Sequence, residues 1–381
     1  MASTSLSRRL PTSLLRNSLS LFTRRFTSDL SHLNAELCAR KIPLIYDSLA
    51  PDNSHKLQIA LSACLPSHWT NTTAFPPPLP PADADADADA PPAGAAAELL
   101  PPAHHLVYFN PAIPADRLLA DGTDPLQSPG PPFVRRMWAG GYLNFGKGGP
   151  RLRFAGCSGH HAQPPGVCLE GIRDVRVKGK DGEEKVFVGI ERRFGSGRRR
   201  VPGEGEDEIR QRLWRETEED LGEAELVERR NIVFMRERSP EEARKASETK
   251  TTKILRAQHA PDFSYAFTPT PALLFRYSAL TFNAHRIHLD PQYCREVEGH
   301  RDLLFHGPLS LTLLMTQLEA QLQGTGKAIE FFEYRNLAPL YCNEEVKVCG
   351  KDLGDGKYEL WAENAEGALS VKGTARAGNK Q

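Results

Sequence analysis

The chain has 381 residues, which is enough for two domains of ordinary size. Lysine and arginine together number 48, as do aspartate and glutamate, so the formal net charge is +0 and gives no support for nucleic acid or an anionic membrane as the main partner. No apolar run approaches the roughly 20 residues that span a bilayer. The 7 cysteines are scattered without a Cys-x-x-Cys pair, which favours free thiols over a disulfide framework or a structural zinc site.

Residues 1–28 have the composition of a targeting segment. They are rich in serine, threonine and leucine, and no acidic residue precedes Asp29. An Arg-rich, Ser-rich and acid-free N-terminus is typical of a mitochondrial transit peptide, and we expect cleavage after Phe26. A disordered basic tail is the alternative. The arginines of the segment are Arg8, Arg9, Arg16, Arg24 and Arg25.

Residues 29–236 are predicted to form an N-terminal domain. Apolar residues recur at helical spacing within 29–70, which predicts helices there. Residues 74–102 are proline, alanine and an Ala-Asp repeat that cannot fill a core, so we expect a disordered insertion. A second solvated loop is expected at 195–208. Alternating apolar residues predict strands at 167–178, 185–194 and 230–236.

Residues 237–259 are strongly charged and are predicted to be a linker to a second domain at 260–377. That domain begins with a predicted strand at 263–267. The helix predicted at 307–323 is apolar on nearly all sides and must therefore be buried. A long apolar helix followed by antiparallel strands indicates a sheet curled around the helix, and we expect two such α+β halves, with one composite sheet as an option. The following strands are predicted at 328–335, 344–351, 357–363 and 367–375.

Two polar features stand among the apolar residues of the second domain. One is the segment Asn283–His288, with the sequence Asn-Ala-His-Arg-Ile-His. The other is His306-Gly307-Pro308, which opens the long helix. A neutral imidazole can move protons near physiological pH, and the unpaired N–H groups of a helix N-terminus can stabilise a developing oxyanion. Together they are what proton chemistry at a thioester carbonyl requires.

These two features together resemble the hydratase-2 motif of the MaoC-like hot-dog family, which runs Asp-x-Asn-Pro-x-His and then His-Gly at the start of the hot-dog helix. The segments 133–141 and 332–341 also resemble the branch of mitochondrial hydroxyacyl-thioester dehydratases type 2 and mesaconyl-C4-CoA hydratases. The resemblance implies an α+β double hot-dog fold, with two antiparallel sheets each wrapped around a long helix. It also implies that the N-terminal half is catalytically silent and makes room for the acyl chain.

The resemblance implies roles for three residues. His288 takes the place of the motif histidine and Asn283 that of the motif aspartate. Because an amide cannot take a proton, we expect His288 to be the base and Asn283 to position water or the 3-hydroxyl group. Gly307 takes the place of the glycine whose N–H holds the thioester oxygen, and His285 and His306 are expected to shape the substrate pocket or to hold the loop.

The expected function is a hydro-lyase reaction, the reversible dehydration of 3-hydroxyacyl thioesters in the mitochondrial matrix. The favoured substrates are carried by acyl carrier protein in fatty-acid synthesis, and CoA thioesters, including mesaconyl-C4-CoA, are the alternative. A thioesterase and a non-enzymatic lipid-binding protein on the same fold are rival interpretations. We expect no cofactor, no metal ion, no nucleic acid and no membrane span, and the oligomeric state stays open, a homodimer included.

Overall fold

The computed structural model describes residues 30–69, 99–154, 166–196, 205–249 and 255–380. The expected transit peptide, residues 1–28, lies outside the described residues, as does nearly all of the expected insertion at 74–102. Within the described ranges, no helix combines the length and the apolar character that crossing a membrane needs.

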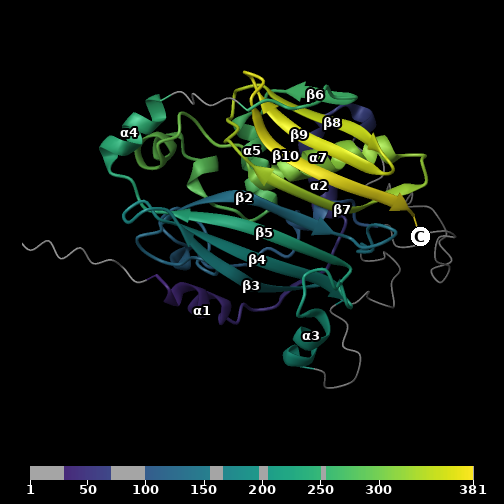
Figure 1. The fold of residues 1–381 in the computed structure, drawn as a ribbon, viewed down its shortest axis with the longest axis horizontal. Coiled ribbons are helices and arrows are strands. Elements are labelled where there is room, and N and C mark those ends of the chain that lie inside the picture. The colour runs from purple at the N-terminus through teal and green to yellow at the C-terminus, as the bar shows by residue number, and fades with distance from the viewer. Residues whose placement is uncertain (1–29, 70–98, 155–165, 197–204, 250–254, 381) are drawn as a thin grey trace, which may run out of the picture.

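In the described residues, one antiparallel sheet of 10 strands runs through both halves of the chain (Figure 1). Its order is β1-β3-β4-β5-β2-β7-β10-β9-β8-β6, so the first five strands come from the N-terminal half and the last five from the C-terminal half. The predicted strands are all present, with small shifts at their ends. The strands are β1 (Ile45–Asp47), β2 (Arg135–Asn144), β3 (Gly166–Lys178), β4 (Lys185–Ser196), β5 (Leu226–Met235), β6 (Phe263–Phe267), β7 (Lys327–Asn336), β8 (Val346–Gly354), β9 (Lys357–Asn364) and β10 (Leu369–Asn379).

The pairing of β2 with β7 joins the two halves into one sheet. Gly140 and Gly141 of β2 lie opposite Arg335 and Tyr334 of β7. A Cβ at Gly140 would lie 2.3 Å from the carbonyl oxygen of Tyr334, and a Cβ at Gly141 would lie 1.7 Å from that of Arg229. Both glycines also have positive φ angles. Only glycine tolerates this backbone and this close approach, so the two glycines permit the composite sheet.

The helix α7 (Gly307–Leu322) lies in the curve of the C-terminal half of the sheet (Figure 1). It contacts β7, β8 and β9, which explains why apolar residues occupy most of its surface. This agrees with the prediction of a buried helix at 307–323. Its fully buried apolar side chains are Leu309, Leu311, Leu313, Leu314, Met315 and Leu318.

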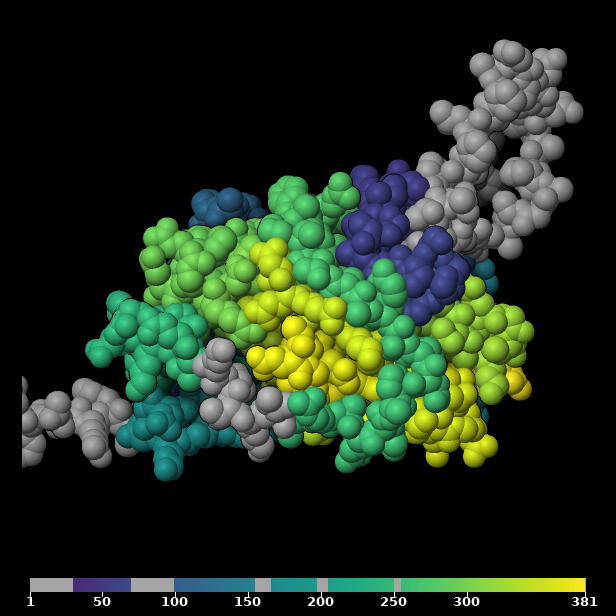
Figure 2. Space-filling view, turned by 90° about the horizontal axis from the view of Figure 1, so that it is seen from above, coloured from purple at the N-terminus to yellow at the C-terminus, as the bar shows by residue number. Residues whose placement is uncertain are grey.

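The two halves differ in how helices cover the sheet. In the N-terminal half, α2 (Asp52–Ser62) is shorter than α7. It packs against α5 (Pro271–Leu280) of the C-terminal half. Figure 2 shows residues of the N-terminal half, in purple, beside green residues of the C-terminal half on the surface. The helix α4 lies within the predicted linker 237–259, and neither α4 nor α5 was predicted. The further helices are α1 (His32–Cys38), α2 (Asp52–Ser62), α3 (Glu206–Leu213), α4 (Pro240–Glu248), α5 (Pro271–Leu280) and α6 (Pro291–Tyr293), with single turns η1 (Ser67–Trp69), η2 (His104–Val107), η3 (Ala115–Arg117), η4 (Arg286–His288) and η5 (Cys294–Glu298).

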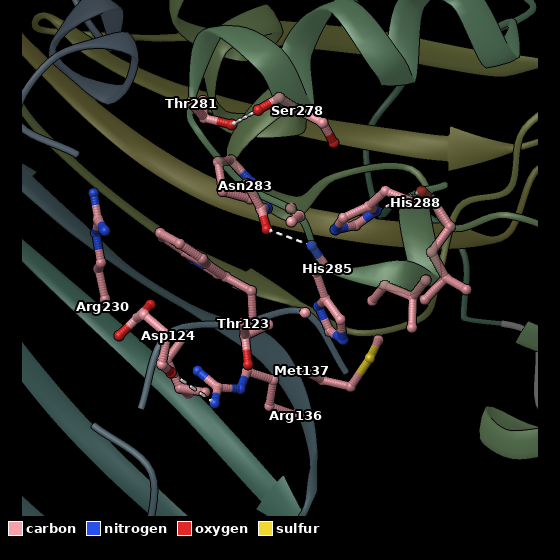
Figure 3. A pocket seen from close by; sticks show the side chains of 18 of the residues that line it. Thr123, Asp124, Arg136, Met137, Arg230, Ser278, Thr281, Asn283, His285 and His288 are labelled. Carbon is pink, nitrogen blue, oxygen red and sulfur yellow. Dashed lines mark hydrogen bonds between the residues drawn. The ribbon is translucent and has the colours of Figure 1, made fainter. Parts of the chain in front are cut away.

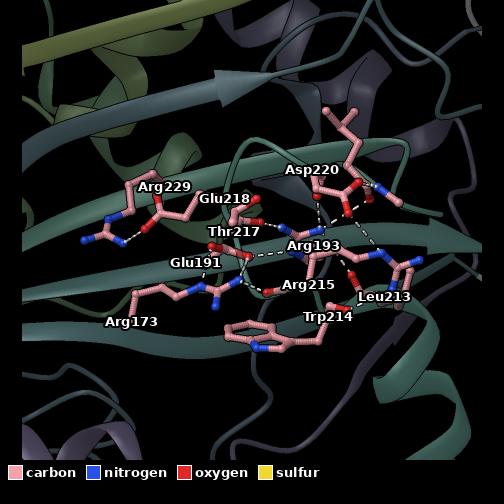
Figure 4. A network of polar contacts seen from close by, with 12 residues as sticks. Arg173, Glu191, Arg193, Leu213, Trp214, Arg215, Thr217, Glu218, Asp220 and Arg229 are labelled. Carbon is pink, nitrogen blue, oxygen red and sulfur yellow. Dashed lines mark hydrogen bonds and ion pairs between the residues drawn. The ribbon is translucent and has the colours of Figure 1, made fainter.

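A buried ion pair fastens the loop after α3 onto the N-terminal strands (Figure 4). Arg193 and Glu191 of β4 are both fully buried, and the Arg193 Nε donates to Glu191 Oε1 at 2.5 Å. The rest of the Arg193 guanidinium donates to main-chain carbonyls of the loop, including Thr217 at 3.0 Å and Asp220 at 2.7 Å. Because these hydrogen bonds satisfy the buried charge, the network stabilises the scaffold.

Candidate active site

A cavity of about 920 Å³ lies between the two halves of the chain. Of the residues that the sequence singled out, Asn283, His285, His288 and Gly307 line this cavity, and Figure 3 shows the first three from close by. His306 lies directly behind His288 and is not among the lining residues. Four of the five predicted site residues therefore share one space.

The turn after α5 positions Asn283. The Asn283 N–H donates to the Ser278 carbonyl at 2.8 Å, and the Asn283 Oδ1 accepts the His285 N–H at 3.0 Å. Phe282, directly before it, has a φ of 50°, a left-handed backbone that is costly for a bulky residue. Because Oδ1 is used within the turn, the Asn283 Nδ2 remains as the group that can donate to a ligand.

The ring of His288 is buried and held by a hydrogen bond. Its side chain is 7% exposed, and its Nδ1 lies 2.8 Å from the Leu304 carbonyl oxygen. Since a carbonyl only accepts, Nδ1 carries the proton and Nε2 keeps its lone pair. Among the described residues Nε2 has no hydrogen-bond partner. Burial lowers the pKa of His288 to about 4, although the bond to Leu304 acts in the opposite direction.

His306 supports His288 from behind. The two rings are stacked with centroids 3.6 Å apart and planes 19° apart. His306 is fully buried, and its Nε2 forms a 2.9 Å hydrogen bond with the Ser278 hydroxyl. Burial, and then the neighbouring His288, hold the pKa of His306 well below its ordinary value. Two neutral imidazoles can stack in this way without charge repulsion.

Gly307 is the first residue of α7 and faces the cavity. A Cβ at this position would lie 3.0 Å from the Asn336 Nδ2 and 3.1 Å from the Trp138 Cβ, so a side chain would displace its neighbours. The first N–H groups of a helix have no partner within it, and the helix dipole adds positive potential there. Pro308 has no N–H, which costs little in a first turn. The N-terminal end of α7, with its positive potential, therefore lies at the cavity.

The N-terminal half contributes charged groups to the cavity that the sequence did not point to. Glu170 Oε2 lies 3.0 Å from the Arg192 Nε, and Arg230 Nε lies 2.7 Å from Glu228 Oε1. The Arg230 guanidinium also lies over the Trp138 ring, 5.0 Å from its centroid. Glu170 and Arg192 lie opposite each other on β3 and β4, whereas Arg230 and Glu228 are two residues apart on β5. The charges of Glu170 and Arg230 are thus each paired with a charge of opposite sign.

The described residues contain no group of three or more histidine, cysteine, aspartate or glutamate side chains that could hold a metal ion. Imidazole and amide side chains and the start of α7 are among the groups that line the cavity. A neutral imidazole close to donors for an oxyanion can abstract a proton next to a carbonyl group.

The comparisons with known proteins identify the family of this chain. The family model for hydroxyacyl-thioester dehydratase type 2 matches residues 103–342. The mitochondrial hydroxyacyl-thioester dehydratase type 2 of Schizosaccharomyces pombe is 28% identical over 69% of this chain and 80% of its own length. Mesaconyl-C(4)-CoA hydratase of Chloroflexus aurantiacus is 31% identical over 76% of this chain and 88% of its own length.

Solved structures support the fold. A MaoC-like dehydratase from Phytophthora capsici aligns with a TM-score of 0.56 at 13% identity, over 91% of this chain and 99% of that one. At this identity the likeness bears on the fold alone, and it confirms the predicted double hot-dog architecture. Because the family model covers well over half of the sequence, this chain belongs to the hydroxyacyl-thioester dehydratase type 2 family.

Proposed function

We propose that the protein is a hydro-lyase that interconverts 3-hydroxyacyl and trans-2-enoyl thioesters, with His288 as its base. The family and the relatives support thioester dehydration and hydration. The observation that carries the assignment of His288 is its tautomer: Nδ1 is bound to the Leu304 carbonyl, which leaves Nε2 unprotonated in a cavity that Gly307 also lines.

In the proposed dehydration, the thioester oxygen accepts a hydrogen bond from the Gly307 N–H. This bond stabilises the enolate-like charge that develops as the C2–H bond breaks, and one such donor is typically worth about 10²–10³ in rate. His288 Nε2 takes the C2 proton. The C3–O bond then breaks, the C2–C3 double bond forms, and His288 returns the proton to the departing hydroxide as water.

Asn283 is proposed to position the 3-hydroxyl group, or the attacking water in the hydration direction. Its Oδ1 accepts a hydrogen bond within the turn, so its Nδ2 is the group that is free to donate to that oxygen. Because an amide cannot take a proton, this assignment leaves His288 to carry the proton in both directions.

The physiological substrate is proposed to be carried by acyl carrier protein in mitochondrial fatty-acid synthesis. One support is the Arg-rich N-terminal sequence. The other is that the relatives from Schizosaccharomyces pombe and Saccharomyces cerevisiae are mitochondrial hydroxyacyl-thioester dehydratases type 2. The bacterial mesaconyl-C(4)-CoA hydratase favours a CoA thioester instead. A fusion of residues 1–40 to a fluorescent protein should direct it to mitochondria, and a cytosolic fusion would contradict the location.

One experiment tests both the reaction and the carrier. The purified protein is given crotonyl groups on CoA and on acyl carrier protein, while enoyl absorbance and free thiol are followed together. The proposal expects enoyl absorbance to fall without thiol release, and kcat/KM to be higher with the carrier protein. Thiol release would identify a thioesterase, and equal or higher kcat/KM with CoA would contradict the carrier assignment.

A further inference from the structure

A loop of the N-terminal half touches the Asn283–His288 segment directly. The Arg286 N–H donates to the Asp121 carbonyl at 2.9 Å. At the next residue, Gly122, a Cβ would lie only 2.1 Å from the Ala284 carbonyl oxygen. Gly122 has a φ of 85°, which other residues rarely adopt. The loop is therefore built to lie against the backbone of the catalytic segment.

The carboxylate of Asp121 points toward His285. Its Oδ1 accepts hydrogen bonds from the Thr123 N–H at 2.9 Å and from the Thr123 hydroxyl at 2.6 Å, which fix its orientation. Its Oδ2 lies 3.6 Å from the His285 Nε2 and 3.6 Å from the Arg136 Nε. Asp121 is 3% exposed and His285 is 5% exposed, so the contact is shielded from solvent.

The three atoms that face one another at Asp121 lack hydrogen bonds in the described part of the chain. Asp121 Oδ2, His285 Nε2 and Arg136 Nε are each fully buried, and none has a hydrogen-bond partner among the described residues. A buried polar atom that stays unpaired destabilises the folded state. The atoms are separated by only a few tenths of an ångström more than a hydrogen bond, so a small movement would pair all three. We infer that Asp121 forms hydrogen bonds with both His285 and Arg136.

We propose that Asp121 is a positioning residue of the active site, which acts through His285. Its carboxylate holds the Nε2–H of His285, so Nδ1 becomes the acceptor nitrogen of the ring. His285 lines the cavity edge-on to His288, with ring centroids 5.6 Å apart and planes at 84°. In this place a fixed acceptor can hold the 3-hydroxyl group or water beside the base.

This proposal rests on the proposed function and refines it. It gives the N-terminal half a part in organising the active site, whereas the resemblance implied a catalytically silent half. It also gives the site a carboxylate–imidazole pair, although Asn283 has replaced the aspartate of the family motif.

The test is a double-mutant cycle between Asp121→Asn and His285→Ala, with hydration of crotonyl thioester as the assay. Asparagine keeps the Oδ1 that binds Thr123 but presents an NH₂ group to His285, which selects the opposite tautomer. We expect kcat to fall about tenfold to a hundredfold with KM changed less than about threefold. In the His285→Ala background, the same substitution should lower kcat by less than about twofold.

Asp220→Asn is the matched control. Asp220 Oδ1 likewise accepts the N–H two residues on, from Gly222 at 2.9 Å, and Oδ2 likewise faces an arginine, the Arg215 Nε at 3.5 Å. Asp220 does not line the cavity. A loss of kcat with Asp121→Asn and not with Asp220→Asn would therefore arise at the active site.

The outcomes separate the two proposals. Unchanged kcat in Asp121→Asn, or an equal loss with and without His285, would overturn the role of Asp121 while the wild-type protein stays active. An inactive wild-type protein would overturn the proposed function, and this proposal with it. If Asp121→Asn does not fold, Thr123→Val removes the hydroxyl that orients the carboxylate. It should then lower kcat less, and again only when His285 is present.

Discussion

The clearest quantitative prediction concerns the acidic limb of the pH–rate profile. His288 must be neutral to act as a base, and burial lowers its pKa to about 4. At pH 5 about 90% of such an imidazole is neutral, whereas about 3% of an ordinary histidine would be. The hydration kcat/KM should therefore stay nearly constant from pH 8 down to pH 5. An ordinary histidine would lower it about thirtyfold over the same range.

The assay is the initial rate of crotonyl-CoA hydration at constant ionic strength and at substrate concentrations far below KM. Under these conditions the profile reports the free enzyme. Acid destabilisation must be separated from titration of the base. His288 takes up a proton near pH 6.5 in the unfolded protein but only near pH 4 in the folded protein. The free energy of unfolding therefore decreases as the pH falls from 6.5 to 4, by roughly 2 kcal/mol at pH 5.

Circular dichroism at each pH, and recovery of the rate on return to pH 7.5, provide that control. A folded and reversible protein whose kcat/KM falls with an apparent pKa near 6.5 would refute the reasoning. The base would then be a solvated histidine, or His288 would be less buried in solution than in the structure.

Three further predictions concern single substitutions. Gly307→Ala places a Cβ 3.1 Å from Trp138 and should lower kcat by about 10²–10³ by displacing the helix N–H, with little loss of stability by thermal unfolding; wild-type kcat would show that this N–H is not used. Asn283→Ala should slow steady-state hydration less than His288→Ala, and the reverse order would make the amide the more important group. Leu313→Ala should cost about 2–5 kcal/mol in urea unfolding because Leu313 is fully buried in α7, and a cost below about 1 kcal/mol would contradict the packing.

The periodic parts of the fold could be predicted from the sequence. The strands β7 to β10 and the helix α7 have regular apolar patterns, and their predicted bounds differ from the structure by only a few residues. The strand β2 was not predicted, because Ala139-Gly140-Gly141 has poor strand propensity and pairs only because β5 and β7 lie on either side. The helix α4 was not predicted, because its charged residues were assigned to a linker. The capping box formed by Ser239 and Glu242 is a sequence pattern that indicates the start of this helix.

The candidate site was predictable where its residues are local and not where they meet across the fold. Asn283, His288 and Gly307 stood out because they lie within a short motif and at a helix start. Asp121 carries no such signal: Asp-Gly-Thr reads as an ordinary turn, and its contact with His285 spans two halves of the chain. Pairings of this kind follow from the packing of the sheet.

The most direct test of the account is kcat for crotonyl thioester hydration in His288→Ala. The control variant is His259→Ala, which removes an imidazole that pairs with Glu359 outside the cavity. Both variants should fold, as judged by circular dichroism. The account predicts that His288→Ala lowers kcat by about 10²–10⁴ while His259→Ala keeps it within about twofold. A folded His288→Ala protein that hydrates the substrate at the wild-type rate would contradict the account.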